Sequence, residues 1–298
     1  SFAAMLARET HVNAAGGGAS RIQTSFEFSD GFGRTIQKKI PAEAGLAPER
    51  QAAVPLPSGD VRPGDLDRDP QDRLVLSNTA PRWVGSGRTV FNNKGNPVRQ
   101  YEPFFSATPL YETEPEMTDT GVSSVLFYDP VGRVMSTLHP NHTYDKVVFD
   151  AWQQTTYDVN DTVAARGAQT GDPRTDPDIA GYVRHYLTAQ PATWRTWYAE
   201  RIGRPAGDPE RDAAEKAFGH ADTPTTAHFD ALGRPFLTVA RNRFTRNGGV
   251  TEEDYLSRVE LDLEGNQRSV HDAQNRTVLQ YRYDMRGSRL QQSSMAAG

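Results

Sequence analysis

The chain of 298 residues contains no cysteine. Disulfide scaffolds, thiol catalysis and cysteine-ligated zinc sites are therefore excluded, although this absence does not decide the compartment. Basic side chains are also outnumbered, because 33 Lys and Arg stand against 38 Asp and Glu and give a formal net charge of −5. This balance argues against a dedicated nucleic-acid-binding protein, which usually carries a basic domain or stripe.

Long apolar runs are missing as well. No stretch approaches the roughly 18 apolar residues of a membrane-spanning helix. Residues 1–6 carry no basic region ahead of an apolar run, so they lack the pattern of a signal peptide. Since the chain does not begin with methionine, we expect it to be a piece of a longer protein, and the missing signal then says little about export.

Turn-forming residues are abundant, with 25 Gly and 20 Pro, and many of them belong to a repeat. The repeat has the form hydrophobic-Asp-x-x-Gly-Arg, and it is cleanest at residues 128–133 and 229–234. Residues 29–34 lack only the leading aromatic, and residues 283–288 lack only the Arg. Degenerate copies begin at residues 91, 261 and 271, and Phe149-Asp150 is a possible copy without the Gly.

The spacing within the repeat predicts a tight turn. Asp in the first position and Gly in the fourth are the preferences of a type I turn, in which the carboxylate accepts backbone N–H bonds. Gly takes a positive φ at no steric cost, and Asn is the next-best residue there. The residues before and after each turn alternate between apolar and polar as strands do, so each copy is predicted to form a β-hairpin. The predicted structural turn residues are Asp30, Gly33, Arg34, Asn92, Gly95, Asp129, Gly132, Arg133, Asp230, Gly233, Arg234, Asp262, Gly265, Asp272, Asn275, Asp284 and Gly287.

The copies and the gaps between them predict the organisation of the chain. Residues 1–40 hold the first repeat strands, and residues 41–82 form a Pro-rich irregular loop. Residues 83–163 and 221–298 are repeat β segments, separated by an insertion with short helices at 164–220. The predicted fold class is therefore mainly all-β: an antiparallel hairpin meander that forms a curved shell segment, with a small α-helical insertion.

Local signals refine the two irregular parts. Asp176-Pro177 and Asp208-Pro209 each have the pattern of an N-cap followed by Pro at the first helical position. We therefore expect helices to begin at both places. Residues 16–18, Gly-Gly-Gly, are expected to form a flexible joint.

Several residue groups could carry chemistry, but each has a plainer explanation. His139 and His142 are spaced for zinc, yet Pro140 and the lack of a third ligand favour a turn. Residues 65–69, Asp-Leu-Asp-Arg-Asp, begin like a calcium loop, but Pro and Leu occupy the positions that need Gly and Glu. The clustered Asp145, Asp150, Asp158 and Asp161 could serve a glycosidase, although spacing alone is weak evidence.

Two further features have structural explanations. Tryptophans that could stack on sugars, Trp83, Trp152, Trp194 and Trp197, are more commonly packing residues in strands. A row formed by the repeat arginines could bind a ligand, but local pairing with acids or solvation is favoured. Motifs of nucleophile elbows, zinc proteases and P-loops are absent. The sequence therefore predicts no catalytic, cofactor-binding or metal-binding residue.

The repeats resemble the YD (Tyr-Asp) repeats of Rhs-type polymorphic toxins. Longer blocks are similar to the B component of insecticidal toxin complexes (Tc toxins), and this similarity is weakest at residues 41–80 and 164–220. These blocks are residues 82–87, 91–95, 101–106, 137–144, 148–150, 154–162, 221–225 and 259–267. They match the shell part of B, and nothing resembles its propeller or the toxic segment.

The resemblance implies a non-enzymatic, secreted structural protein. In this family the B component joins the C component to form a hollow YD-repeat shell, which encloses the toxic segment of C until it passes through the pore of the A component. The implied partners are the rest of B, the C component and, indirectly, the A component, with no nucleic acid, cofactor or direct membrane insertion. The alternatives are a cell-surface carbohydrate-binding or adhesion module and a glycoside hydrolase.

Overall fold

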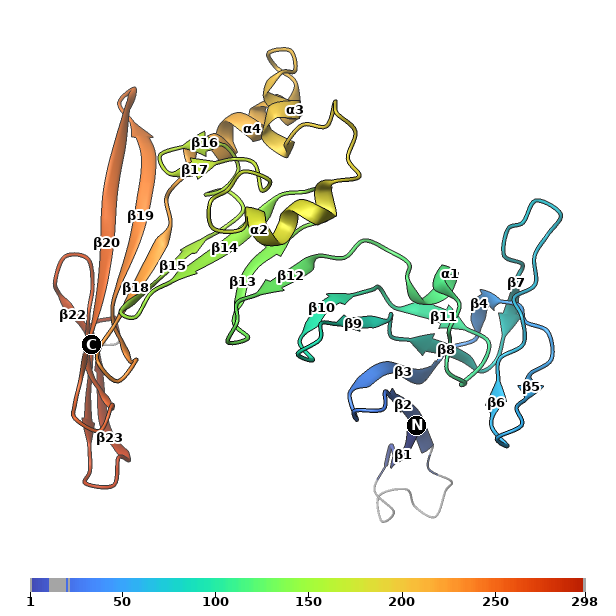
Figure 1. The fold of residues 1–298 in the computed structure, drawn as a ribbon. Helices are drawn as coiled ribbons and strands as arrows, with labels where there is room; N and C mark the ends of the chain where they lie inside the picture. Colours follow the sequence, from blue (N-terminus) through green and yellow to red (C-terminus); the bar gives the residue numbers. More distant parts are fainter. Residues whose placement is uncertain (1, 11–19, 21, 297–298) are drawn as a thin grey trace. The chain divides into compact units, whose positions relative to one another are not determined.

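The computed structural model describes residues 2–10, 20 and 22–296 (Figure 1). The predicted flexible joint at residues 16–18 lies outside the described residues. The chain divides into two compact units, Ser1–Ser124 and Val125–Gly298, and each is described by itself. No helix in the described part is long and apolar enough for a membrane crossing.

The first unit is built on a five-stranded antiparallel sheet in the order β1-β2-β3-β8-β11. Aromatic rings pack between its strands, with the Phe26 and Trp83 centroids 5.6 Å apart. The strands are β1 (Phe2–Arg8), β2 (Ile22–Ser29), β3 (Thr35–Ala42), β8 (Arg82–Gly85) and β11 (Phe104–Ser106). The unit also contains the hairpin of β9 (Thr89–Phe91) with β10 (Pro97–Gln100) and the short helix α1 (Pro115–Thr118).

The Pro-rich stretch at residues 41–82 is more regular than the sequence predicts. β4 (Gly45–Pro48) pairs with β7 (Leu76–Thr79), and β5 (Val54–Pro55) pairs with β6 (Val61–Arg62). The expectation of an irregular loop was therefore wrong for these residues. The prolines are tolerated because Pro48 and Pro55 end strands of two-stranded ribbons, where a missing N–H leaves no central ladder bond unmade.

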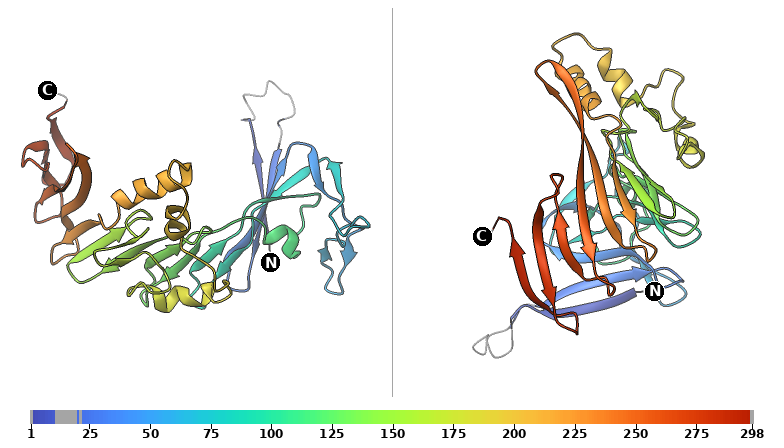
Figure 2. Two further views of the ribbon diagram at one scale, coloured as in Figure 1. Left: turned by 90° about the horizontal axis from the view of Figure 1, so that it is seen from above. Right: turned by 90° about the vertical axis from the view of Figure 1, so that its left-hand side faces the viewer.

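The second unit is an antiparallel meander (Figure 2). Neighbouring strands pair in the order β12-β13-β14-β15-β18-β19-β20-β21-β22-β23. The mainly all-β, antiparallel fold class is thereby confirmed. The first strands are β12 (Val125–Tyr128), β13 (Val134–Leu138), β14 (Tyr144–Phe149), β15 (Gln153–Tyr157) and β18 (Thr225–Phe229). The remaining strands are β19 (Pro235–Arg246), β20 (Gly249–Leu261), β21 (Gln267–His271), β22 (Thr277–Tyr283) and β23 (Arg289–Ser294).

The insertion between β15 and β18 carries the helices, as predicted. Its elements are β16 (Ala165–Arg166), β17 (Gln169–Thr170), α2 (Ala180–Val183), a 3-10 turn η1 (Arg184–Leu187), α3 (Trp197–Ile202) and α4 (Pro209–Gly219). Asp208 caps α4, since its carboxylate accepts the Glu210 N–H at 2.8 Å. The expected helix start at Pro177 was wrong, because α2 begins at Ala180. Asp176 still bonds to the turn ahead of α2, because one carboxylate oxygen accepts the Asp178 N–H at 3.0 Å and its carbonyl accepts the Ala180 N–H at 2.9 Å. Its other carboxylate oxygen is bonded to the sheet.

The core of the second unit lies between the insertion and one end of the meander (Figure 1). Val125, Phe127 and Leu138 alternate inward along β12 and β13 and are buried. From the insertion, Ile179 and Val183 are completely buried as well. The strands from β19 to β23 are mostly exposed or half-buried, so within the described residues this part of the sheet lacks a comparable covering layer.

Candidate functional site

The repeated turn is built by one carboxylate. At residues 230–234, the Gly233 N–H donates to the Asp230 carbonyl at 2.9 Å, which closes a type I turn. One oxygen of the Asp230 carboxylate accepts the N–H groups of Leu232 and Arg234 at 2.9 and 3.0 Å. The other accepts Arg234 Nε at 2.7 Å. Gly233 has a φ of +74°, and the strand register shifts beside it, as in a type I turn followed by a bulge.

The other predicted turn residues lie in turns of the same kind. At residues 30–34, 92–96, 129–133, 262–266, 272–276 and 284–288, the first residue accepts the fourth residue's N–H, and its side chain accepts the fifth residue's N–H. Asn275 takes the Gly position with a φ of +58°. Asp150 departs from this pattern, because its turn is one residue tighter and its backbone N–H donates to the Gln153 carbonyl.

The repeat turn has two further copies. The sequence analysis missed the one at Asp69, and at His139 it favoured a turn without relating it to the repeat. Asp69 accepts the Arg73 N–H and Arg73 Nε, with Asp72 at a φ of +62° in the Gly position. His139 begins a turn in which His142 has a φ of +64°. The letters Asp-Pro-Gln-Asp-Arg could have revealed the first copy. The histidine pair therefore lies in a turn, as the sequence favoured. The described residues hold no group of three or more His, Asp or Glu that could bind a metal.

The arginine of the repeat also ties its turn to neighbouring residues. Arg133 lies 3.9 Å from the Phe149 ring centroid, and Arg34 lies 4.6 Å from that of Phe91. Arg234 donates to the Asp262 carbonyl, in the next turn of the same kind, at 3.2 Å. These cation–π and hydrogen-bond contacts link successive hairpins.

Replacing Gly233 with valine should destabilise the second unit by at least about 1 kcal/mol, because a β-branched residue is strained at positive φ. A Cβ at Gly233 would meet nothing within 4 Å, so the backbone alone sets the cost. Gly233→Asn should cost less, since Asn tolerates this conformation. Urea unfolding measures both. If both melts overlaid that of the parent chain, the turn would not constrain the fold.

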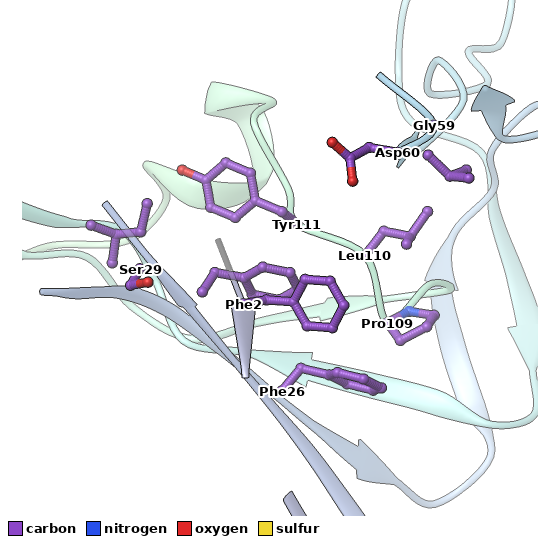
Figure 3. Close-up of a pocket in the computed structure, with 11 residues that line it drawn as sticks. Phe2, Phe26, Ser29, Gly59, Asp60, Pro109, Leu110 and Tyr111 are labelled. Atoms are coloured by element: carbon purple, nitrogen blue, oxygen red, sulfur yellow. The ribbon is translucent and has the colours of Figure 1, made fainter. Parts of the chain in front are cut away.

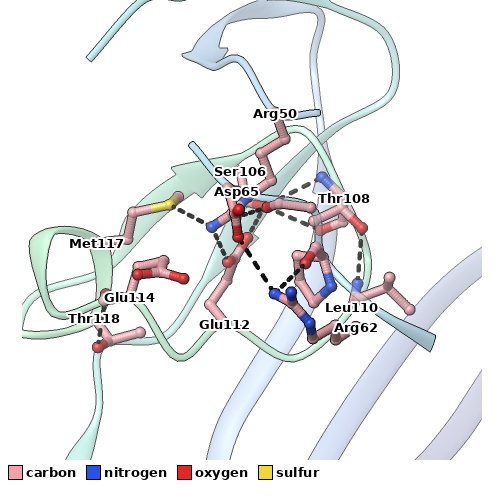
Figure 4. Close-up of polar contacts among 12 residues, drawn as sticks. Arg50, Arg62, Asp65, Ser106, Thr108, Leu110, Glu112, Glu114, Met117 and Thr118 are labelled. Atoms are coloured by element: carbon pink, nitrogen blue, oxygen red, sulfur yellow. Dashed lines mark hydrogen bonds and ion pairs between the residues drawn. The ribbon is translucent and has the colours of Figure 1, made fainter. Parts of the chain in front are cut away.

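A buried ion cluster holds the first unit together (Figure 4). Lys39 and Glu112 are completely buried, with Lys39 Nζ 3.3 Å from a Glu112 carboxylate oxygen. Glu112 also pairs with Arg50 and accepts the Ser106 hydroxyl at 2.6 Å. Lys39 donates to the Thr108 carbonyl at 2.9 Å. Because these side chains have almost no exposed surface, the cluster clamps β3 to the segment after β11 and offers no access to a substrate.

A second buried cluster joins the insertion to the meander. Lys146 on β14 donates to Asp176 at 2.8 Å and to Asp178 at 2.7 Å. The Tyr144 hydroxyl donates to the same Asp176 oxygen at 2.8 Å. Hydrogen bonds and ion pairs to both aspartates outweigh desolvation and raise the pKa of Lys146. The insertion is therefore fixed to the sheet by charge as well as by apolar packing.

The first cluster predicts a pH dependence of stability. Burial lowers the pKa of Lys39 to about 8, against the opposing attraction of Glu112. Between that value and the unfolded pKa of about 10.4, the unfolded chain keeps a proton that the folded chain has released. Stability from this group should therefore rise with pH, by at most about 1.4 kcal/mol per unit, and be lost as pH falls through about 8.

Urea melts between about pH 7.5 and 9.5 measure this slope, with Lys39→Met as the control that should flatten it. The raised pKa of Tyr144, which follows from burial and Asp176, acts in the opposite direction at higher pH, so the range stops below pH 10. Parallel slopes for the parent chain and the variant would contradict the prediction.

An apolar cavity of about 560 Å³ opens in the first unit (Figure 3). Phe2, Phe26, Leu110 and Tyr111 line it, with Asp60 among its few polar groups. A sugar ring placed here would leave most of its hydroxyls without hydrogen-bond partners, which is unfavourable. The cavity suits an apolar group, and its lining offers no acid–base pair.

Comparison with solved structures identifies the fold. The crystal structure of TcdB2-TccC3 matches 94% of this chain at 22% identity with a TM-score of 0.57. That of TcdB2-TccC3-TEV matches 100% at 20% identity with a TM-score of 0.60. This chain has the fold of part of TcdB2-TccC3. The Tc holotoxin pore of Photorhabdus luminescens matches 94% of the chain at 20% identity and a TM-score of 0.58.

The expected resemblance to Tc toxin components is thereby confirmed for the fold. The chain spans 11% of the length of each of these TcdB2-TccC3 and holotoxin chains. No family model matches the sequence, and no curated protein does.

The clustered aspartates proposed for glycoside hydrolysis are engaged in local structure in this Tc-like fold. Asp145 pairs with a His139 ring nitrogen at 3.1 Å. Asp150 and Asp158 each accept backbone N–H bonds of 2.7 Å within their own turns. Burial raises the pKa of Asp161, whose carboxylate accepts backbone N–H bonds. All four carboxylates therefore have structural partners.

The tryptophans of the Tc-like fold are mostly packed. Trp83 is buried in the first unit. Trp194 and Trp197 have arginine guanidinium groups 4.3 and 4.5 Å from their ring centroids. Trp152 is the exception, because it stands exposed on the turn between β14 and β15.

The turn carboxylates predict acid sensitivity. The backbone N–H of Arg234, and then its side chain, hold the pKa of Asp230 below its ordinary value, and the Arg276 side chain does the same for Asp272. Their contribution is present above the unfolded pKa of about 3.9 and is lost as pH falls below it. The Tm from thermal unfolding should therefore fall as the pH is lowered from about 5 to 3. Asp272→Asn should reduce that drop, and an unchanged pH profile would contradict the assignment.

Proposed function

We propose that this chain is a wall segment of the hollow YD-repeat shell of a Tc-toxin B component. With a C component, that shell would enclose the toxic segment of C before passage through the pore of an A component. The observation that carries the proposal is the uncovered meander from β19 to β23, together with the fold it shares with TcdB2-TccC3. A wall needs a broad, continuous sheet, and successive hairpins supply one.

The chemistry of the described residues supports a non-enzymatic role. A container needs an enclosed volume and closed sheet edges, because exposed edges invite aggregation. The ionisable groups with the largest pKa shifts, Lys39 and Tyr144, lie in buried clamps and meet no cavity described above. The charged clusters therefore serve rigidity, which a wall under load from its contents requires.

Protease protection tests the proposal. The assembly is isolated from the producing organism through an affinity tag on this chain and treated with protease before and after unfolding in urea. A co-purifying toxic segment should resist cleavage in the intact assembly and be degraded after unfolding. Equal cleavage in both states, or a chain that purifies without larger repeat polypeptides, would refute the shell role.

A glycan array separates the shell from the adhesion alternative. Trp152 is the exposed tryptophan among the described residues, and indole rings stack well on sugars, so Trp152→Ala is the matched variant. The shell role predicts no specific binding by the parent chain. Micromolar binding that disappears in Trp152→Ala would instead assign an adhesion module.

A further inference from the structure

The meander of the second unit has two rims with different chemistry. In an antiparallel meander, successive turns lie alternately at the two ends of the strands. The first rim therefore consists of the turns at residues 129–133, 150–152, 230–234, 262–266 and 284–288. The second rim consists of the turns at residues 139–143, 247–248 and 272–276, and the helical insertion also leaves the sheet at this rim.

Every turn of the first rim carries one large, exposed apolar side chain. The exposed fractions are 76% for Val131, 60% for Trp152, 73% for Leu232, 97% for Leu263 and 99% for Met285. The turns of the second rim carry His, Pro and Asn at 139–142, Asn and Gly at 247–248, and Ala, Gln and Asn at 273–275. Within the turns themselves, large exposed apolar side chains therefore occur at the first rim, and Val250 stands on a strand beside the second.

The turn itself does not require these side chains. Asp and Gly fix its first and fourth positions, and the apolar side chains between them take no part in the hydrogen bonds that close it. A single exposed Leu is ordinary on a protein surface, but an apolar tip on each turn of one rim forms a patterned surface. The carboxylate of each first-rim turn is already satisfied internally, as at Asp230 and Asp284. The apolar tips are therefore what this rim offers to a partner.

We infer that the first rim is the contact surface, or seam, along which this segment packs against another strip of hairpin repeats in the same shell. Such a neighbouring strip is called a course below. The inference rests on the proposed function. Strands β12, β13, β14, β15 and β18 have only four to six residues, so the strip there is about 14–20 Å wide at 3.4 Å per residue. A strip this narrow encloses a cargo only if successive courses meet rim to rim.

The spacing of the tips fits such a partner. First-rim turns of adjacent hairpins are two strands apart, which is about 10 Å. A second course of hairpins repeats with the same period, so its turns can receive one apolar tip each. A lipid surface is a poorer match, because the acids of the first-rim turns outnumber their arginines and the chain has a net charge of −5.

Cysteine labelling tests the seam, and the cysteine-free chain makes it clean. Single variants Leu232→Cys, Leu263→Cys and Met285→Cys report on the first rim. Gln274→Cys reports on the second rim, and Val250→Cys is the matched control because Val250 is 64% exposed and outside the first rim. Each variant is treated with a maleimide reagent as the isolated chain and in the tagged assembly.

All five thiols should react at similar rates in the isolated chain. In the assembly, the labelling rate of the first-rim thiols should fall at least about tenfold. The labelling rates of Gln274→Cys and Val250→Cys should change by less than about threefold. Equal labelling at the two rims, whether fast or slow, would overturn the seam while leaving the shell role intact. Failure to recover any assembly would refute the proposed function and the seam with it.

Vesicle flotation covers the lipid alternative. The isolated parent chain should not float with phosphatidylcholine vesicles. Flotation that is lost in a Leu263→Ser, Met285→Ser double variant but kept in Val250→Ser would assign the rim to lipid and overturn the seam.

Discussion

Replacing Glu112 with glutamine is expected to destabilise the first unit by about 3–5 kcal/mol, the typical cost of removing one partner from a buried ion pair. Glu112 balances two buried cations, Lys39 and Arg50. Glutamine keeps the volume, so the loss measures charge rather than a cavity. It also leaves Lys39 to its remaining bond with the Thr108 carbonyl. Urea unfolding, followed by tryptophan fluorescence, gives the change.

Glu116→Gln is the matched control, because Glu116 pairs with Arg68 at the surface at 2.8 Å. Exposed pairs contribute little, so its urea midpoint should stay close to that of the parent chain. Replacing the whole cluster by apolar residues, with Lys39→Met, Arg50→Met and Glu112→Leu, should recover much of the loss, since no buried charge remains. Equal midpoints for Glu112→Gln and Glu116→Gln would show that the buried cluster does not hold the unit.

Replacing Asp176 with alanine should cost the second unit about 3–5 kcal/mol for the same reason. Asp176 is completely buried and accepts from both Lys146 and the Tyr144 hydroxyl. Without it, the buried Lys146 retains only the more exposed Asp178 as its charged partner. The insertion should therefore loosen from β14, and amide hydrogen exchange in α2 should accelerate along with the drop in urea midpoint.

Asp178→Ala provides the comparison for this cluster. Asp178 also pairs with Lys146, but its side chain is 39% exposed, so its loss should cost much less. If the two variants unfolded at the same urea concentration, the buried carboxylate would have no special part in holding the insertion.

The sequence predicted the hairpin meander because each turn is a local structure. Asp230, Gly233 and Arg234 lie within five consecutive residues, so their spacing alone specifies the carboxylate bonds and the positive φ. The same reasoning missed the turn at Asp69 and did not relate the turn at His139 to the repeat, because Asp72 and His142 occupy the position that the pattern reserved for Gly. Backbone geometry admits these residues at a modest cost, which the fold of each unit tolerates.

The sequence by itself determined the turns and the antiparallel pairing of the strands that each turn joins, since both depend on contacts between near neighbours. It also placed the helical insertion, although β15 and β18 pair across it. Only the tertiary structure decided which charges are buried. Lys39 meets Glu112 across 73 residues, and Lys146 meets Asp176 across 30. No local pattern marks these residues as partners, because their burial depends on where distant segments cross the sheet.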